Sequence, residues 1–161
     1  MKKTLFVILL MILFSVTSKS QSLPGFKLPD VDGNDVSFAD ITGNSVTIVS
    51  FWATWCSPCK EEMKKLNELY NKYKDKGLQY IAINQDDQKS VSKVKAFVNA
   101  QNYGFTVLLD TDKKIFESFN GKDEIPYTII LNKNKDIVSS HTGFKTGDEV
   151  NIEEEIKALL K

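Results

Sequence analysis

The segment Phe51-Trp52-Ala53-Thr54-Trp55-Cys56-Ser57-Pro58-Cys59-Lys60 contains both cysteines of this 161-residue chain. Residues 46–51, which lead into this segment, are apolar and largely β-branched, which is typical of a buried strand. The residues that follow repeat apolar side chains at the spacing of a helix, at Met63, Leu66, Leu69, Tyr70 and Tyr73. We therefore expect the two cysteines at the point where a buried strand ends and an amphipathic helix begins.

This position favours thiol chemistry at Cys56. The first turn of a helix has unpaired backbone N–H groups and the positive end of the helix dipole. A sulfur placed there is favoured as the thiolate, which is the nucleophilic form. Cys59 follows one helical turn later, so its sulfur can face that of Cys56. Pro58 suits the first turn, where a missing N–H costs nothing.

A Cys-x-x-Cys pair has three interpretations: a redox dithiol, half of a metal site, or a short structural disulfide. A four-ligand zinc site needs two more ligands, but the chain has no other cysteine and a single histidine, His141. A structural disulfide that closes so small a loop stabilises little, because the entropic effect grows with loop length. The spacing and its strand–helix context favour the redox dithiol.

Residues 51–60 resemble the active-site segment of the thioredoxin superfamily. The resemblance is to exported thiol–disulfide oxidoreductases of the redoxin type, including those that work in cytochrome c maturation. It covers roughly residues 23–161 and implies an α/β, thioredoxin-like fold in a domain of residues 21–161. This fold has a central mixed β-sheet with helices on both faces and an N-terminal hairpin. The activity it implies needs no cofactor.

The rest of the chain supplies the expected elements. Asp32-Gly33-Asn34-Asp35 is a turn signal between two short strands. Further strands are predicted at 78–84, 105–109, 127–131 and 137–141, the last two forming a hairpin. Helices are predicted after Ser90, over 113–119, and after Thr146, where Glu149 would complete a capping box.

The N-terminus has the pattern of a targeting segment. Met1-Lys2-Lys3 is basic, residues 5–14 are an unbroken apolar run, and residues 15–20 include small residues suited to cleavage. The apolar run is short for a membrane span. We expect residues 1–20 to be a signal peptide of an exported, periplasmic protein. The alternative is an uncleaved N-terminal anchor in the inner membrane.

Composition excludes some partners. All 21 basic residues are lysine and balance 21 acidic residues, so the formal net charge is zero. Bidentate arginine recognition of phosphate is therefore absent, and no basic cluster with interleaved aromatic residues suggests nucleic-acid binding. The expected partners are disulfide-containing protein substrates and a membrane thiol electron donor, with the protein itself a monomer.

The resemblance also implies how a substrate is held. Thioredoxin-like proteins have a cis-proline before the strand that faces the dithiol, and Pro126 matches it. Ile125 would then offer backbone hydrogen bonds to a docked peptide. Trp55, Ser57 and Pro58 complete the expected substrate-binding residues, with Trp55 an exposed groove wall and Trp52 mostly in the core.

A base must remove the proton of Cys59 when this residue resolves the mixed disulfide. Thioredoxin has a buried aspartate in the preceding strand, but the matching residue here is Ser50. Asp87 matches an acidic residue used by some exported relatives, so we hypothesise that Asp87 moves this proton. The alternative is that Asp87 caps a turn or helix. Glu62 is interpreted as a first-turn acid favoured by the helix dipole.

Two other functions stay open at this stage. A metallochaperone would bind copper through Cys56, Cys59 and His141, although related copper-delivery proteins have a longer gap between the cysteines. A peroxidase is less well supported, because the threonine-containing segment that precedes a peroxidatic cysteine is absent. Ser57-Pro58 lacks the histidine that strong oxidants of this fold carry between the cysteines. The resemblance therefore favours a reductant, with no metal in the active site.

Overall fold

The computed structural model describes residues 25–161. The expected targeting segment, residues 1–20, lies outside the described residues, and so does the start of the expected domain at residue 21. None of the helices in the described part is long and apolar enough to cross a membrane.

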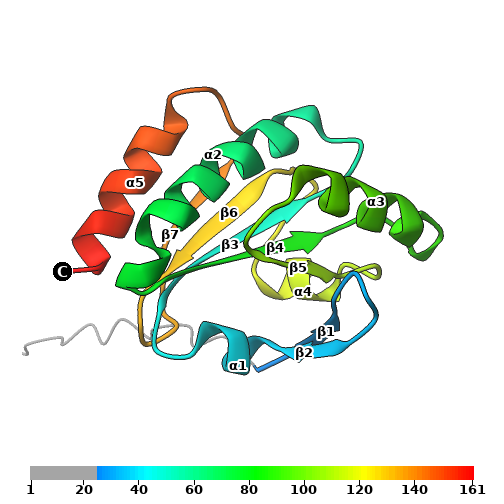
Figure 1. Ribbon diagram of the computed structural model, residues 1–161, viewed down its shortest axis with the longest axis horizontal. Coiled ribbons are helices and arrows are strands. Elements are labelled where there is room, and N and C mark those ends of the chain that lie inside the picture. Colours follow the sequence, from blue (N-terminus) through cyan, green and yellow to red (C-terminus); the bar gives the residue numbers. More distant parts are fainter. Residues whose placement is uncertain (1–24) are drawn as a thin grey trace, which may run out of the picture.

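A five-stranded mixed sheet forms the centre of the molecule (Figure 1). Its strand order is β5-β4-β3-β6-β7. The central strand β3 pairs in parallel with β4 and antiparallel with β6, while β5 extends the parallel half and β7 the antiparallel half. The bounds of these strands are β3 Val46–Trp52, β4 Leu78–Asn84, β5 Thr106–Leu109, β6 Tyr127–Leu131 and β7 Ile137–Thr142.

Helices cover both faces of this sheet, as predicted. Figure 1 shows α2, α3 and α5 on one face, and α1, α4 and the N-terminal hairpin on the other. Two apolar clusters fill these interfaces because the buried strands point alternate side chains to opposite faces. The helices are α1 Phe38–Thr42, α2 Ser57–Tyr73, α3 Val91–Gln101, α4 Lys114–Ser118 and α5 Asp148–Leu159, with 3₁₀ turns η1 Lys74–Lys76 and η2 Gln88–Ser90.

The predicted N-terminal hairpin consists of β1 (Lys27–Pro29) and β2 (Asp35–Ser37), which pair antiparallel. The Asp30 carboxylate accepts hydrogen bonds from the backbone N–H groups of Asp32 and Asn34, at 2.8 and 2.9 Å. These bonds hold the turn that Gly33 completes with a φ of 87°. Asp30 also forms an isolated bridge with Leu108, which brings the hairpin against strand β5.

One predicted helix cap is wrong, and another is in place without its side-chain hydrogen bond. The N-cap of α5 is Gly147 instead of Thr146, because the chain enters this helix with a φ of 110°, which only glycine adopts easily. Glu149 still accepts a hydrogen bond from the Gly147 N–H, at 2.7 Å. Ser90 precedes α3 but makes no side-chain cap hydrogen bond.

Candidate active site

The two cysteines lie at the start of α2, where the end of β3 delivers them, and they form a disulfide. Cys56 is the N-cap of the helix, and its Sγ accepts a hydrogen bond from the Cys59 N–H at 3.2 Å. Pro58 is in the first turn, as predicted. Cys56 is 5% exposed and Cys59 is fully buried. Cys56 is therefore the sulfur that a substrate can reach, and Cys59 lies behind it.

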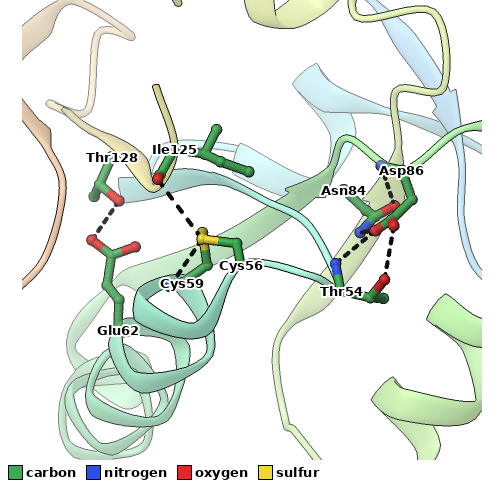
Figure 2. Close-up of a disulfide and its surroundings, with 8 residues drawn as sticks. All are labelled: Thr54, Cys56, Cys59, Glu62, Asn84, Asp86, Ile125 and Thr128. Atoms are coloured by element: carbon green, nitrogen blue, oxygen red, sulfur yellow. Dashed lines mark hydrogen bonds between the residues drawn. A yellow bond between two sulfur atoms is a disulfide. The ribbon is translucent and has the colours of Figure 1, made fainter. Parts of the chain in front are cut away.

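The opposite wall is the segment before β6. The Ile125–Pro126 peptide bond is cis, as the resemblance implied. The Ile125 carbonyl oxygen lies 3.7 Å from Cys56 Sγ, as Figure 2 shows. The disulfide sulfur has no hydrogen to donate, so this is a close contact in the oxidised protein. Backbone groups beside the reactive sulfur are placed where an extended peptide could pair with them.

The surface around the disulfide is shaped by Trp55, Ser57 and Pro58, which are all exposed. Trp55 is 68% exposed, whereas Trp52 is fully buried, so the predicted division between the two tryptophans is confirmed. A cavity of about 110 Å³ lies next to Trp55 and Ile125 and is also lined by Gln85 and Phe116. The site therefore combines a large apolar contact surface with a small recess.

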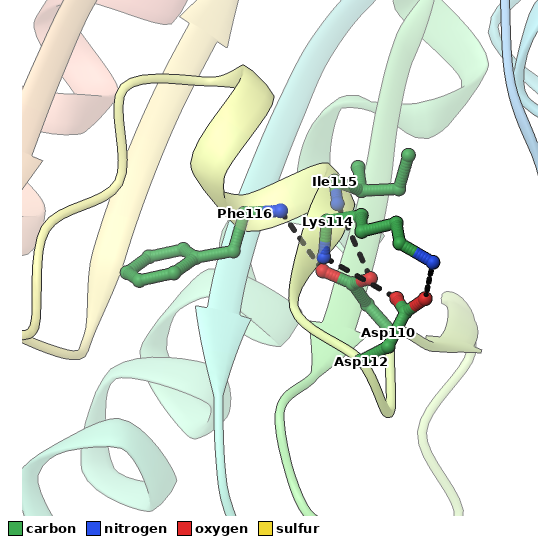
Figure 3. A network of polar contacts seen from close by, with 5 residues as sticks. All are labelled: Asp110, Asp112, Lys114, Ile115 and Phe116. Atoms are coloured by element: carbon green, nitrogen blue, oxygen red, sulfur yellow. Dashed lines mark hydrogen bonds and ion pairs between the residues drawn. The ribbon is translucent and has the colours of Figure 1, made fainter.

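A polar network places α4 beside this recess. Asp110, directly after β5, is almost fully buried, and its carboxylate accepts hydrogen bonds from the backbone N–H groups of Ile115 and Phe116, at 3.2 and 2.8 Å. Figure 3 shows this cap, together with the exposed ion pair between Asp112 and Lys114. Gln85 also donates to Asp110, at 3.2 Å. Asp110 therefore links the end of β4 to α4, on which Phe116 lines the recess.

Glu62 is a buried carboxyl one helical turn after Cys59, on the same face of α2. It is only 1% exposed and lies beyond the first turn of α2, which begins at Ser57, so its interpretation as a first-turn acid is wrong. Its Oε1 accepts a hydrogen bond from the Thr128 hydroxyl at 2.8 Å, and Oε2 has no hydrogen-bond partner among the described residues. Burial raises the pKa of Glu62 to about 8, the Thr128 hydrogen bond opposes this rise, and the charge of Asp148 adds to it.

Hydroxyl groups occupy the place behind the dithiol where thioredoxin has its aspartate. Ser50 Oγ and the Tyr80 hydroxyl are 2.9 Å apart and buried. Burial, together with the nearby Glu62, raises the pKa of Tyr80 well above its usual value. Tyr80 is therefore a neutral group at physiological pH, and Glu62 is a buried carboxyl close to it.

The two neighbouring aspartates after β4 have different environments. Asp87 is exposed, and its Oδ1 accepts from the Ser90 N–H at 3.0 Å, so it caps η2. Asp86 is 5% exposed and binds the backbone and hydroxyl of Thr54 (Figure 2). The structure thus shows the capping contact that was the alternative for Asp87. Sequence alone cannot distinguish the two adjacent aspartates.

The positions of the candidate copper ligands do not favour the metallochaperone alternative. Both cysteine sulfurs are joined to each other, and His141 Nε2 lies 3.3 Å from a Glu155 carboxylate oxygen. Within residues 25–161, no group of three or more histidine, cysteine or acidic side chains is arranged to hold a metal ion.

A mixed sheet flanked by helices, with a disulfide at a helix N-terminus that faces a cis-proline, defines the class of thioredoxin-like thiol–disulfide oxidoreductases. The chain belongs to the AhpC/TSA family, which matches residues 20–140.

Relatives and solved structures agree with this class. The chain is 35% identical over 127 residues to the thiol–disulfide oxidoreductase ResA of Bacillus thuringiensis (strain Al Hakam), covering 79% of this chain and 71% of that protein. It is 30% identical to ResA of Bacillus subtilis (strain 168), covering 80% and 70%. The structure of a proposed thiol:disulfide interchange protein DsbE from Chlorobium tepidum matches with a TM-score of 0.79 and 31% identity, covering 87% and 96%. A thioredoxin-like protein from Porphyromonas gingivalis matches with a TM-score of 0.73 and 30% identity, covering 86% and 92%.

Proposed function

We propose that this chain is a thiol–disulfide oxidoreductase that reduces disulfides of exported proteins through the dithiol of Cys56 and Cys59. The observation that carries the proposal is the position of Cys56 Sγ. This sulfur lies at the start of α2, accepts a hydrogen bond from the Cys59 N–H, and is next to the Ile125 carbonyl. A nucleophile and a peptide-docking edge therefore lie side by side, and the names of the relatives support the same activity.

The first step is an attack by the Cys56 thiolate on one sulfur of the substrate disulfide. The substrate S–S bond breaks, a new S–S bond joins Cys56 to the substrate, and the released substrate thiolate takes a proton from solvent. The Cys59 N–H and the helix dipole stabilise the Cys56 thiolate before attack. Trp55 and the Ile125 backbone, with Ser57 and Pro58 at the rim, hold the substrate polypeptide in place.

The second step is the resolution of the mixed disulfide by Cys59. Its thiol loses a proton, the thiolate attacks Cys56 Sγ, and the substrate leaves as its second thiolate, which is protonated. The substrate gains two electrons and two protons, and the protein loses them. We infer that Glu62 accepts this proton when its carboxyl is ionised: it lies one helical turn after Cys59 on the same face of α2, and its raised pKa of about 8 is close to the ordinary cysteine value of about 8.5. The hypothesis for Asp87 stays a competing prediction.

The same proposal includes the location and the recharging of the protein. The basic and apolar pattern of residues 1–20 supports export to the periplasm, as a cleaved leader or as an anchor. The domain is then residues 21–161, acting as a monomer. In an oxidising compartment a reductant must be recharged, and a membrane thiol protein is the expected electron donor.

The test is the reduction potential of the Cys56–Cys59 pair, measured by equilibrating the protein in defined glutathione or dithiothreitol buffers. We expect a value near that of thioredoxin, roughly −250 mV or lower, which makes the protein a reductant. A value near roughly −120 mV would reverse the direction that we propose. The absence of a reversible couple, or rapid consumption of peroxide, would remove the proposed function.

A further inference from the structure

The segment that delivers the nucleophile is held by one buried carboxylate. Thr54 lies between the end of β3 and Cys56, and both of its polar donors point to Asp86. The Thr54 N–H donates to Asp86 Oδ2 at 2.7 Å, and the Thr54 hydroxyl donates to Oδ1 at 2.7 Å. Both oxygens of the carboxylate therefore bind one residue, two positions before the reactive cysteine (Figure 2).

The Asp86 carboxylate is in turn bound to the end of β4, the strand next to the central strand β3. Asn84, the last residue of β4, donates through Nδ2 to Asp86 Oδ2 at 2.8 Å. Its Oδ1 accepts from the Asp86 N–H at 3.0 Å. Asn84 is 1% exposed and is paired in register with Trp52 at the end of β3. The contacts thus run from the end of β4 through Asp86 to Thr54 and from there to Cys56.

The hydrogen bonds between Asp86 and Thr54 can affect the equilibrium between the dithiol and the disulfide. In the dithiol form, closure is an intramolecular reaction, and its equilibrium depends on how closely the two sulfurs are held together. Cys59 is fixed by the helix, whereas Cys56 is the N-cap, where regular helix hydrogen bonding begins. The segment before Cys56 is therefore the part whose freedom can vary, and Thr54 is where Asp86 restricts it.

We propose that Asp86 is a positioning residue for thiol–disulfide exchange: by holding Thr54 it keeps Cys56 next to Cys59 in the reduced protein, and so favours the disulfide. The proposal rests on the proposed function and adds to it a determinant of reducing strength. It assigns the buried Asp86 a task distinct from proton transfer, which the exposed Asp87 was expected to perform. Loosening the clamp makes the protein a weaker reductant.

The experiment compares four proteins: wild type, Thr54→Ser, Thr54→Val and Asp86→Asn. Thr54→Ser keeps both donors and is the matched control. Thr54→Val keeps the carboxylate charge and the backbone donor and removes only the hydroxyl donor. Each full chain is equilibrated in glutathione buffers, and the fraction of disulfide is measured by thiol alkylation and mass.

We expect the equilibrium constant for disulfide formation to fall about three- to tenfold in Thr54→Val and Asp86→Asn, which corresponds to about 14–30 mV. Thr54→Ser should remain within about 1.5-fold of wild type, because its hydrogen bonds are retained. A shift in Asp86→Asn without one in Thr54→Val would show that the hydroxyl contact does not set the equilibrium and would overturn the clamp as proposed, in which both Thr54 donors hold Cys56 in place. If Asp86→Asn does not fold, the two Thr54 variants decide the question by themselves.

A merely structural role gives a different result. A substitution that weakens the oxidised and reduced folds equally leaves the redox equilibrium constant unchanged. Urea unfolding of both forms tests this, because the difference between their stability losses must equal the change in the redox equilibrium. Equal losses with an unchanged constant would overturn the proposal. A wild-type protein without a reversible couple would instead overturn the proposed function, so the two failures are distinguishable.

Discussion

At the scale of single residues, proton transfer at Cys59 depends on which carboxyl lies close to it. Glu62 shares a helix face with Cys59, is buried, and has an oxygen without a hydrogen-bond partner among the described residues. Asp87 is exposed and caps η2. The raised pKa of Glu62 means that it holds and releases a proton in the same pH range as a cysteine thiol. We therefore expect the resolving step to depend on Glu62.

Glu62→Gln should slow the resolution of the mixed disulfide about tenfold or more above about pH 8, where the Glu62 carboxyl is ionised and can accept the proton, and less at pH 7, where most of it is protonated. Single-turnover kinetics with a fluorogenic peptide disulfide separate this step from the first attack by Cys56. Asp87→Asn should change the same step less than about twofold, since general base catalysis does not pass through it. The opposite pattern, with slow resolution in Asp87→Asn alone, would support the hypothesis made from sequence and contradict the role of Glu62.

The residue-scale predictions succeeded where local sequence determines the environment. The positions of Cys56, Cys59 and Pro58 follow from the strand–helix junction, and so does the division between Trp52, the last residue of the buried strand, and Trp55, which lies in the turn after it. Glu62 was misjudged because its burial depends on Thr128, which is 66 residues away in sequence. The burial of Asp86 depends in the same way on Thr54. Their neighbours in sequence contain no signal of these contacts.

At the scale of elements, Asp110 joins three parts of the fold. It follows β5, caps α4 through Ile115 and Phe116, and accepts from Gln85 after β4. The sequence predicted this short helix, but it did not predict that the aspartate before it would be buried. A helix of this length is too short to be stable by itself. Its position beside the recess therefore depends on this carboxylate.

Asp110→Ala should lower the free energy of unfolding by about 3 kcal/mol, because it leaves several buried donors without an acceptor. Urea unfolding followed by circular dichroism measures the change. Asp112→Ala is the matched control: this exposed aspartate pairs with Lys114, and its loss should cost less than about 0.5 kcal/mol. Equal effects of the two substitutions would contradict the role assigned to Asp110.

The prediction of elements was accurate for the regular segments and failed at the start of α5. Alternating or continuous apolar runs gave the strands, and the turn at Gly33 gave the hairpin. The start of α5 depends on the φ of Gly147, and a threonine followed three residues later by a glutamate imitates a capping box. Backbone conformation at such positions is determined by how the helix packs on the sheet, which sequence patterns do not reveal.

At the scale of the whole molecule, the buried Glu62 links stability to pH. Its pKa is raised from the ordinary value of 4.5 to about 8 by burial. Between these values the folded state binds more protons than the unfolded state. The stability that comes from the protonated carboxyl is complete below about pH 4.5 and is lost as the pH rises through about 8.

Oxidised wild-type protein should therefore lose stability between pH 5 and pH 8, by an amount on the order of 5 kcal/mol at most, since each tenfold change in proton affinity is worth about 1.4 kcal/mol. Glu62→Gln should remove most of this slope, because glutamine does not titrate. Guanidinium unfolding at several pH values measures both proteins. Parallel curves for the two proteins would show that other groups cause the dependence.

The order of the strands also has a consequence for synthesis. The chain makes β3 and both cysteines early, but the wall at Ile125 comes 69 residues after Cys56. Strand β6 must then insert beside β3, a pairing between distant parts of the chain. A nascent chain that ends before β6 already has both thiols, but it has no docking edge for a client polypeptide. Selective exchange therefore requires β6 to be in place, and a chain that lacks it has a cysteine pair without a docking edge.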